Sequence, residues 1–332
     1  MLLVLACFAL LPVAQAGNNT AYGDGTLSHV TTGENNSAFG WGALFSNTSG
    51  ARNTAIGAGT LVLNTGGSGN TAVGTSALLS STSAFNTAVG DSALSSSTTG
   101  GPFSGQANTA VGNSALYHCT TGYWNVAIGY TAGYDLTNGH QNVFIGQAAG
   151  NNVTTASNVI CIGQGVGGAN ADHTCAIGEI FGRPSSGGSA VFVNASGILG
   201  TSTSSKRFKE GIKPMDKASE ALYALKPVTF RYNKEMDPSG IRQFGLVAED
   251  VDEVNPDLVV RDKDGKVNSV RYDQVNAMLL NEFLKEHRKV QQLEGTISSL
   301  AATVKEQAAQ IQKVSAQIEV SKSATKVVLN NP

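Results

Sequence analysis

The side chains that most often carry chemistry are sparse and scattered over the first 200 residues. The histidines there stand at four separate positions and the carboxylates at six: His29, His118, His140, His173, Asp24, Glu34, Asp91, Asp135, Asp172 and Glu179. A metal site needs ligands that come together, and glycoside hydrolysis needs a pair of carboxylates. We therefore expect no metal and no cofactor, and we keep a polysaccharide-degrading enzyme as the lesser alternative.

The chain has four cysteines, Cys7, Cys119, Cys161 and Cys175. Cys7 lies in a predicted leader, so three thiols would remain, and an odd number cannot form a complete set of disulfides within one chain. Two interpretations stay open: Cys161 pairs with Cys175, or all three are small buried apolar side chains. No C-x-x-C pair is present, so nothing supports a zinc site.

Residues 1–16 form an apolar run that ends in Ala14-Gln15-Ala16. This small-x-small ending is typical of a secretory signal peptide and predicts a secreted or cell-surface protein. The run lacks the usual basic start, and Val4-Leu5-Ala6-Cys7 loosely resembles a lipoprotein box. No later stretch is apolar over the 18 or more residues that a membrane span requires, so we expect no transmembrane span.

Composition divides the 332 residues near position 200. The first 200 hold 34 of the 39 glycines, two basic residues and six acidic ones, whereas the last 132 hold 20 basic and 18 acidic residues. The near-zero net charge of −2 argues against a nucleic-acid partner, which would require a basic surface. Two physically different parts are joined in this chain.

The glycine-rich part repeats the motif Asn-Thr/Ser-Ala-Val/Ile-Gly. The glycines that close these motifs are Gly23, Gly40, Gly57, Gly74, Gly90, Gly112, Gly129, Gly146, Gly163 and Gly178. Six of the nine spacings between them equal 17 residues. A fixed period this short predicts a parallel β-solenoid over residues 17–182, with one coil per repeat.

Each motif is expected to form a short strand, with Thr and Val/Ile on one face and Ala and Gly on the other. The Asn is expected to occupy a left-handed turn, and the following Gly-x-x-Ala-Leu half to form a return strand. One such coil buries little apolar surface, so we expect oligomerisation through the small-residue face.

These tandem repeats resemble the head repeats of trimeric autotransporter adhesins. The resemblance covers roughly residues 18–182 and implies a β-roll of three chains side by side. A flat, Thr-rich solenoid face is also typical of ice-binding proteins, which form a minor alternative.

After a Gly/Ser-rich connector at residues 183–203, the sequence indicates a small α/β domain over residues 204–290. Helical spacing of apolar residues marks 218–225, and alternation marks strands at 228–232 and 244–248. Asp264-Gly265 between two apolar runs predicts a hairpin, and a helix is expected from Tyr272 to about Lys289.

Four segments of this domain closely resemble the endosialidase-type intramolecular chaperone of phage tail spikes and tail fibres. They are Ser204-Ser-Lys-Arg-Phe-Lys-Glu-Gly-Ile212, Leu225-Lys-Pro-Val-Thr-Phe230, Gly245-Leu-Val-Ala-Glu249 and Tyr272-Asp-Gln-Val275. The resemblance implies a domain that folds the trimer and then releases itself with a serine–lysine dyad. The cut falls just before the serine.

Carried onto this sequence, the nucleophile is Ser204, the base is Lys209 and the scissile bond is Thr203–Ser204. A serine hydroxyl is a weak nucleophile until a base takes its proton, and a lysine can do so only when it is neutral. Ser205 stands where the family has Asp, and Phe208 where it has Leu. The alternative is a trimerisation cap that does not cleave.

Apolar residues at alternating spacings of three and four predict a coiled coil over residues 290–320. The positions are Val290, Leu293, Ile297, Leu300, Val304, Gln307, Ile311, Val314 and Ile318, where Gln307 is the polar exception. The core pattern leaves dimer and trimer open, and the attached domains favour a trimer. Residues 321–332 are expected to be a disordered tail.

Together these patterns predict a mainly β, secreted homotrimeric fibre or adhesin-like protein with a C-terminal intramolecular chaperone. Its enzymatic activity would be at most one autoproteolytic cut per chain. The main alternative is a tail fibre or adhesin with a permanent cap, whose solenoid binds a cell-surface glycan or a host protein.

Overall fold

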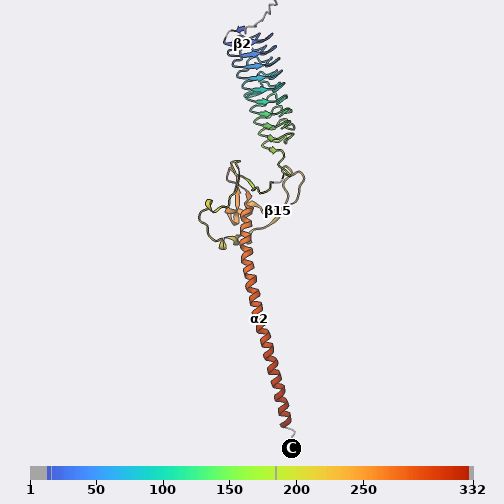
Figure 1. Cartoon of the computed structure of the whole chain (residues 1–332), viewed down its shortest axis with the longest axis vertical. Coiled ribbons are helices and arrows are strands. Elements are labelled where there is room, and N and C mark those ends of the chain that lie inside the picture. Colours follow the sequence, from blue (N-terminus) through green and yellow to red (C-terminus); the bar gives the residue numbers. More distant parts are fainter. Residues whose placement is uncertain (1–12, 16, 184, 329–332) are drawn as a thin grey trace, which may run out of the picture. The chain divides into compact units, whose positions relative to one another are not determined.

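The computed structural model describes residues 13–15, 17–183 and 185–328, which divide into two compact units at residues 185 and 186 (Figure 1). We call them the solenoid unit and the C-terminal unit and describe each by itself. Apart from residues 13–15, the predicted signal peptide lies outside the described residues, and so do residues 329–332 of the predicted tail.

The solenoid unit is one sheet of eleven short strands in chain order. They are β1 (Val13–Gln15), β2 (Asn19–Tyr22), β3 (Ser37–Phe39), β4 (Thr54–Ile56), β5 (Thr71–Val73), β6 (Thr87–Val89), β7 (Thr109–Val111), β8 (Val126–Ile128), β9 (Val143–Ile145), β10 (Ile160–Ile162) and β11 (Cys175–Ile177). Strand β1 is antiparallel to β2, and β2 to β11 are parallel, with equivalent residues of successive repeats paired. The predicted parallel β-solenoid with a spacing of about 17 residues is confirmed, and it has about nine turns (Figure 1).

The small-residue face of each strand lies inside the coil. The central alanines, such as Ala55 and Ala88, are fully buried, whereas Thr54 and Ile56 on either side of Ala55 point outward. Successive residues of a strand point to opposite faces, so burying the Ala row exposes the Thr and Ile/Val rows. The expectation of association through the small-residue face is therefore wrong, because a single chain already uses that face as its core.

The Gly-x-x-Ala-Leu half of the repeat forms a turn rather than the expected return strand. Leu61 and its counterparts in other coils have φ between +48° and +54° and are fully buried. Backbone hydrogen bonds tie these turns from coil to coil, as from Leu61 N to Ala77 O at 3.1 Å. Each coil thus has one strand, closed by turns around a core of one or two alanines and a leucine in most coils, with Phe144, Val153, Val159 and Cys161 in the last ones.

The repeated asparagines form a buried ladder through the solenoid, a role that the sequence analysis missed. Asn53 Oδ1 accepts a hydrogen bond from Asn70 N at 2.9 Å, and Asn53 Nδ2 donates to Gly67 O at 2.8 Å. The same pair of bonds recurs at Asn19, Asn36, Asn70, Asn86, Asn108, Asn125 and Asn142. The left-handed residue is the one before each asparagine, such as Arg52 or Trp124.

The marker glycines are required by conformation and by space. Gly90 has φ of +135°, and a Cβ built on it would lie 2.5 Å from Gly112 O. Equivalent glycines from Gly40 to Gly146 have φ between +125° and +139° and meet the same obstacle. The coils stack too closely here for any side chain.

The three thiols that the structure describes, Cys119, Cys161 and Cys175, do not pair. Cys161 is the central, inward residue of β10, whereas Cys175 is the first residue of β11 and is exposed. Their side chains point to opposite faces, so pairing of these two is wrong for this fold. Cys119 is buried, and burial raises its pKa to about 12, which makes it an inert core residue.

The C-terminal unit contains three two-stranded antiparallel sheets and one long helix. Its elements are β12 (Val191–Val193), β13 (Leu199–Thr201), η1 (Lys206–Phe208), η2 (Asp216–Ala224), β14 (Val228–Phe230), β15 (Gln243–Gly245), α1 (Ala248–Val254), η3 (Pro256–Leu258), β16 (Val259–Arg261), β17 (Val267–Val270) and α2 (Tyr272–Val328). The hairpin at Asp264-Gly265 is confirmed as β16–β17. Helix α2 continues to Val328, well past residue 321, where the tail was expected to begin.

A polar cluster fastens η2 to α2 beside a small apolar core. Glu282 accepts hydrogen bonds from Ser219 Oγ, from Tyr223 OH at 2.6 Å and from Lys285 Nζ at 2.7 Å. The Lys285, Ser219 and Tyr223 hydrogen bonds lower the pKa of Glu282 from 4.5 to about 2, and Glu282 raises the pKa of Tyr223 to about 12. The lowered pKa of Glu282 keeps its carboxylate ionised, and the raised pKa of Tyr223 keeps its hydroxyl protonated as a hydrogen-bond donor.

Replacing Gly90 by Ala should destabilise the solenoid by roughly 2–5 kcal/mol, because the new methyl group adds strain at positive φ and a clash with the next coil. The matched control is Gly101→Ala, where an added Cβ meets no atom within 4 Å. Thermal unfolding followed by circular dichroism checks this. Equal melting temperatures of the two variants would contradict the stacking described here.

Lowering the pH should loosen the contact between η2 and α2. Because the pKa of Glu282 falls from 4.5 to about 2 on folding, its stabilising effect is fully present above pH 4.5 and is lost as the pH drops toward 2. Glu282→Gln should therefore have a melting temperature that depends less on pH over this range. The control Glu294→Gln, at an exposed position of α2, should follow the wild type. A Glu282→Gln curve parallel to the wild type would oppose this assignment.

Candidate autocleavage site

The predicted nucleophile and base lie together on either side of η1, the short turn that follows β13. Lys209 Nζ is 2.9 Å from Ser204 Oγ. The single turn of η1, closed by Phe208 N to Ser205 O at 3.0 Å and Lys209 N to Lys206 O at 3.1 Å, reverses the chain between them. Lys209 then resumes extended backbone, with φ −121° and ψ 137°. A five-residue separation thus becomes a direct side-chain contact.

The contact has the separation needed for proton transfer. As an ammonium, Lys209 donates to the serine oxygen and leaves it a weak nucleophile. As a neutral amine at the same distance, it would accept the hydroxyl proton and make Ser204 reactive. Loss of the lysine proton is favoured by burial or by neighbouring cations.

The surroundings of this pair are open in the single chain. Every residue from 201 to 210 is exposed, including Thr203, whose Oγ1 accepts from Ser205 N at 3.4 Å. Arg207 lies over the Phe208 ring with its guanidinium carbon 4.5 Å from the ring centroid. Lys206 and Arg207 supply positive charge close by in sequence, but none of the residues that the structure describes shields the pair from water.

A second serine lies close to a lysine in the polar cluster between η2 and α2, but this serine is buried and this lysine is ion-paired. Ser219 Oγ lies 3.4 Å from Lys285 Nζ, but the serine is fully buried and its hydroxyl donates to Glu282. Lys285 is ion-paired with Glu282 at 2.7 Å, which favours the charged amine. This serine has neither a free base nor access to a peptide bond, so the cluster is structural.

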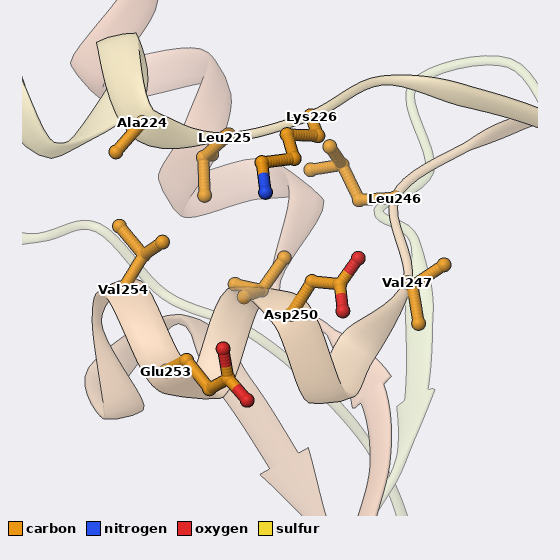
Figure 2. A pocket seen from close by; sticks show the side chains of 9 residues that line it. Ala224, Leu225, Lys226, Leu246, Val247, Asp250, Glu253 and Val254 are labelled. Carbon is orange, nitrogen blue, oxygen red and sulfur yellow. The ribbon is translucent and has the colours of Figure 1, made fainter.

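A small cavity lies between the end of η2 and helix α1. Its volume is about 70 Å³, and Figure 2 shows the Lys226 amine pointing toward α1, which carries Asp250 and Glu253. The cavity has room for about a water molecule or two, and none of its lining residues belongs to segment 203–209. It offers no substrate site for the Ser204–Lys209 pair.

Within the described ranges, no three His, Cys, Asp or Glu side chains gather as a metal site would require. Among the same residues, no helix combines the length and apolar character of a membrane span.

Comparison with known proteins gives a match that covers part of the C-terminal unit. No curated protein and no solved structure matches the chain. A family model described as the chaperone of endosialidase matches residues 204–260, and the match begins at Ser204. The C-terminal unit therefore carries a segment similar to the endosialidase chaperone, the family of intramolecular chaperones found in tail-fibre-type trimeric proteins.

Proposed function

We propose that this protein is a secreted homotrimeric fibre whose C-terminal unit guides trimer folding and is then cut off between Thr203 and Ser204. The observation that carries the proposal is the 2.9 Å contact of Lys209 with Ser204 at the first residue of the family match. The secreted location rests on the leader-like residues 1–16 alone.

The cut follows from ordinary acyl chemistry. Neutral Lys209 takes the hydroxyl proton of Ser204, and Oγ attacks the carbonyl carbon of Thr203. The bond from that carbon to Ser204 N breaks, and the nitrogen takes a proton, which leaves an ester between Thr203 and Ser204 Oγ. Water then hydrolyses the ester to a Thr203 carboxylate and a free Ser204 hydroxyl, with Ser204 as the new N-terminus.

Association would supply the shielding that a single chain lacks. Apolar residues on α2, among them Leu280 and Phe283, are more than half exposed. The heptad residues from Val290 to Ile318 are exposed as well, which is costly unless other chains cover them. If three C-terminal units came together, each Lys209 would lie closer to other cations and farther from water, and cleavage would follow assembly.

The solenoid also has an outward face suited to association. The last residue of each strand from β2 to β11 is apolar, and most of these side chains are exposed: Tyr22, Phe39, Ile56, Val89, Ile128, Ile145, Ile162 and Ile177. They form one row along parallel strands that carry almost no charge. We assign this row, rather than the buried alanines, to contacts between chains.

A non-cleaving trimerisation cap is the second candidate. The observation that favours it is Ser205 at the position of the family's Asp, which removes a carboxylate from beside the nucleophile. In that case the same unit would direct folding and remain attached to the fibre.

Expression of the full chain should give a C-terminal fragment that consists of residues 204–332 and begins at Ser204. Ser204→Ala should abolish the fragment, and Lys209→Arg should reduce it at least about 100-fold, because a guanidinium does not lose its proton. Ser205→Ala is the matched control and should still cleave. Denaturing gels, intact mass and N-terminal sequencing give the readout.

An uncut but folded and trimeric wild-type chain would overturn the cleavage claim and leave the permanent cap. Cleavage that survives Ser204→Ala but is lost in Ser205→Ala would move the nucleophile by one residue.

A further inference from the structure

Aromatic side chains gather on the coils around β7, β8 and β9. The rings of Phe103 and Trp124 are 5.5 Å apart at 41°, and Tyr123 lies edge-on to Trp124 at 5.0 Å. His140 stacks on the other side of Tyr123 at 4.6 Å and 22°. We call Phe103, Tyr123, Trp124 and His140 the aromatic platform.

The platform depends on the one enlarged coil of the solenoid. The spacing from Gly90 to Gly112 is 22 residues instead of 17, and the extra chain carries Phe103. Gly105 O anchors this loop to the asparagine ladder by accepting from Asn86 Nδ2 and Ser97 Oγ, both at 2.8 Å. The insertion is therefore held in place, and it brings Phe103 against Trp124 of the next coil.

The platform is open to a ligand. Phe103 is 54% and Trp124 46% exposed, although their rings touch. Within the described chain, the Trp124 indole N–H and the Tyr123 hydroxyl make no hydrogen bond, and His140 Nδ1 is buried without a partner. Rings with unused polar groups at their edges suit a ligand that has both an apolar face and hydroxyl groups.

The platform is also free of charge. Between Asp91 and Asp135 the sequence contains no Asp, Glu, Lys or Arg. A phosphate, a sialic acid or a cationic ligand would find no opposite charge here, so the ligand must be neutral. The two exposed rings of the platform, Phe103 and Trp124, also offer much less area than the roughly 800 Å² per partner of a stable protein interface.

We propose that the aromatic platform binds a neutral pyranose unit of a glycan. The C–H face of the sugar would stack on Trp124 and Phe103, and its hydroxyl groups would meet the polar edges of Trp124 and Tyr123. This goes beyond trimer assembly and does not depend on self-cleavage, since residues 17–183 carry the platform whether or not the chain is cut.

The test uses the full chain with Trp41→Phe, which leaves Trp124 as the sole tryptophan. An array of neutral oligosaccharides of glucose, galactose, mannose and N-acetylhexosamines, with sialylated counterparts, identifies the sugar, which is then titrated against Trp124 fluorescence. We expect a saturable change that Phe103→Ala weakens at least about tenfold and Phe85→Ala by less than about twofold. Phe85 is a matched control because it is an exposed phenylalanine with a similar φ of +62°, against +66° at Phe103.

Binding to neutral glycans that is lost with Phe103 but kept without Phe85 supports the platform. Absence of binding to every neutral glycan overturns it, and so does equal loss in both variants while circular dichroism stays native. Preference for sialylated glycans contradicts the neutral ligand. Trp124 emission already blue-shifted and inaccessible to acrylamide in the free protein would mean that another copy of the chain covers the platform.

Discussion

The solenoid depends on the asparagine ladder more than on its apolar core. Most coils bury little beyond a leucine and one or two alanines, and the last ones bury Phe144, Val153, Val159 or Cys161 instead, which is too small a core to hold a coil alone. The buried amides join the successive coils from β2 to β10, with bonds such as Asn125 N to Asn108 Oδ1 at 3.0 Å and, at the end of the ladder, Val159 N to Asn142 Oδ1. Removing one amide would leave a buried N–H and a buried C=O without partners, which is more costly than losing two exposed hydrogen bonds.

The same ladder fixes the register. A slip of one residue would place the threonine where the alanine belongs and would move the inward side chains of the strand to its outer face. A slip of one full repeat would preserve nearly every local contact, because the coils are alike. The solenoid by itself therefore does little to determine which coil of one chain lies beside which coil of another. On the proposed account, the C-terminal unit and α2 join the chains at one end, so that coils can add in register from there. Removal of that unit afterwards would make the assembly kinetically stable.

The repeat spacing was enough to predict the strands and the parallel stacking, because a period of 17 allows little else. It was not enough to assign the faces. In Thr-Ala-Val, alternation puts Ala on one face of the strand and Thr and Val on the other, but it does not say which face is buried. Ala lies inside because the coil closes over Leu61 and its counterparts. The asparagine was predicted as a turn residue, since sequence does not reveal that its amide reaches the next coil. Helix α1 was missed because Phe244–Val247 reads as a strand that continues, whereas β15 ends at Gly245.

At the candidate site, the identity of Ser204 and Lys209 came from the family pattern, and their contact required the turn of η1 between them. The position of the platform could have been predicted from the sequence, because the 22-residue spacing between Gly90 and Gly112 marks an enlarged coil. Apart from the neighbours Tyr123 and Trp124, its ring contacts join residues 17 to 21 positions apart, as in Tyr123–His140 and Phe103–Trp124, and no local pattern indicates those.

The central claim is that the exposed apolar row of the solenoid and the exposed heptads of α2 are surfaces between three copies of this chain. Native mass spectrometry or sedimentation of the Ser204→Ala chain, which keeps both units together, measures this directly. The account predicts a complex of three times the single-chain mass, with no folded monomer at micromolar concentration. A folded monomer with an intact, cooperatively melting solenoid would contradict it.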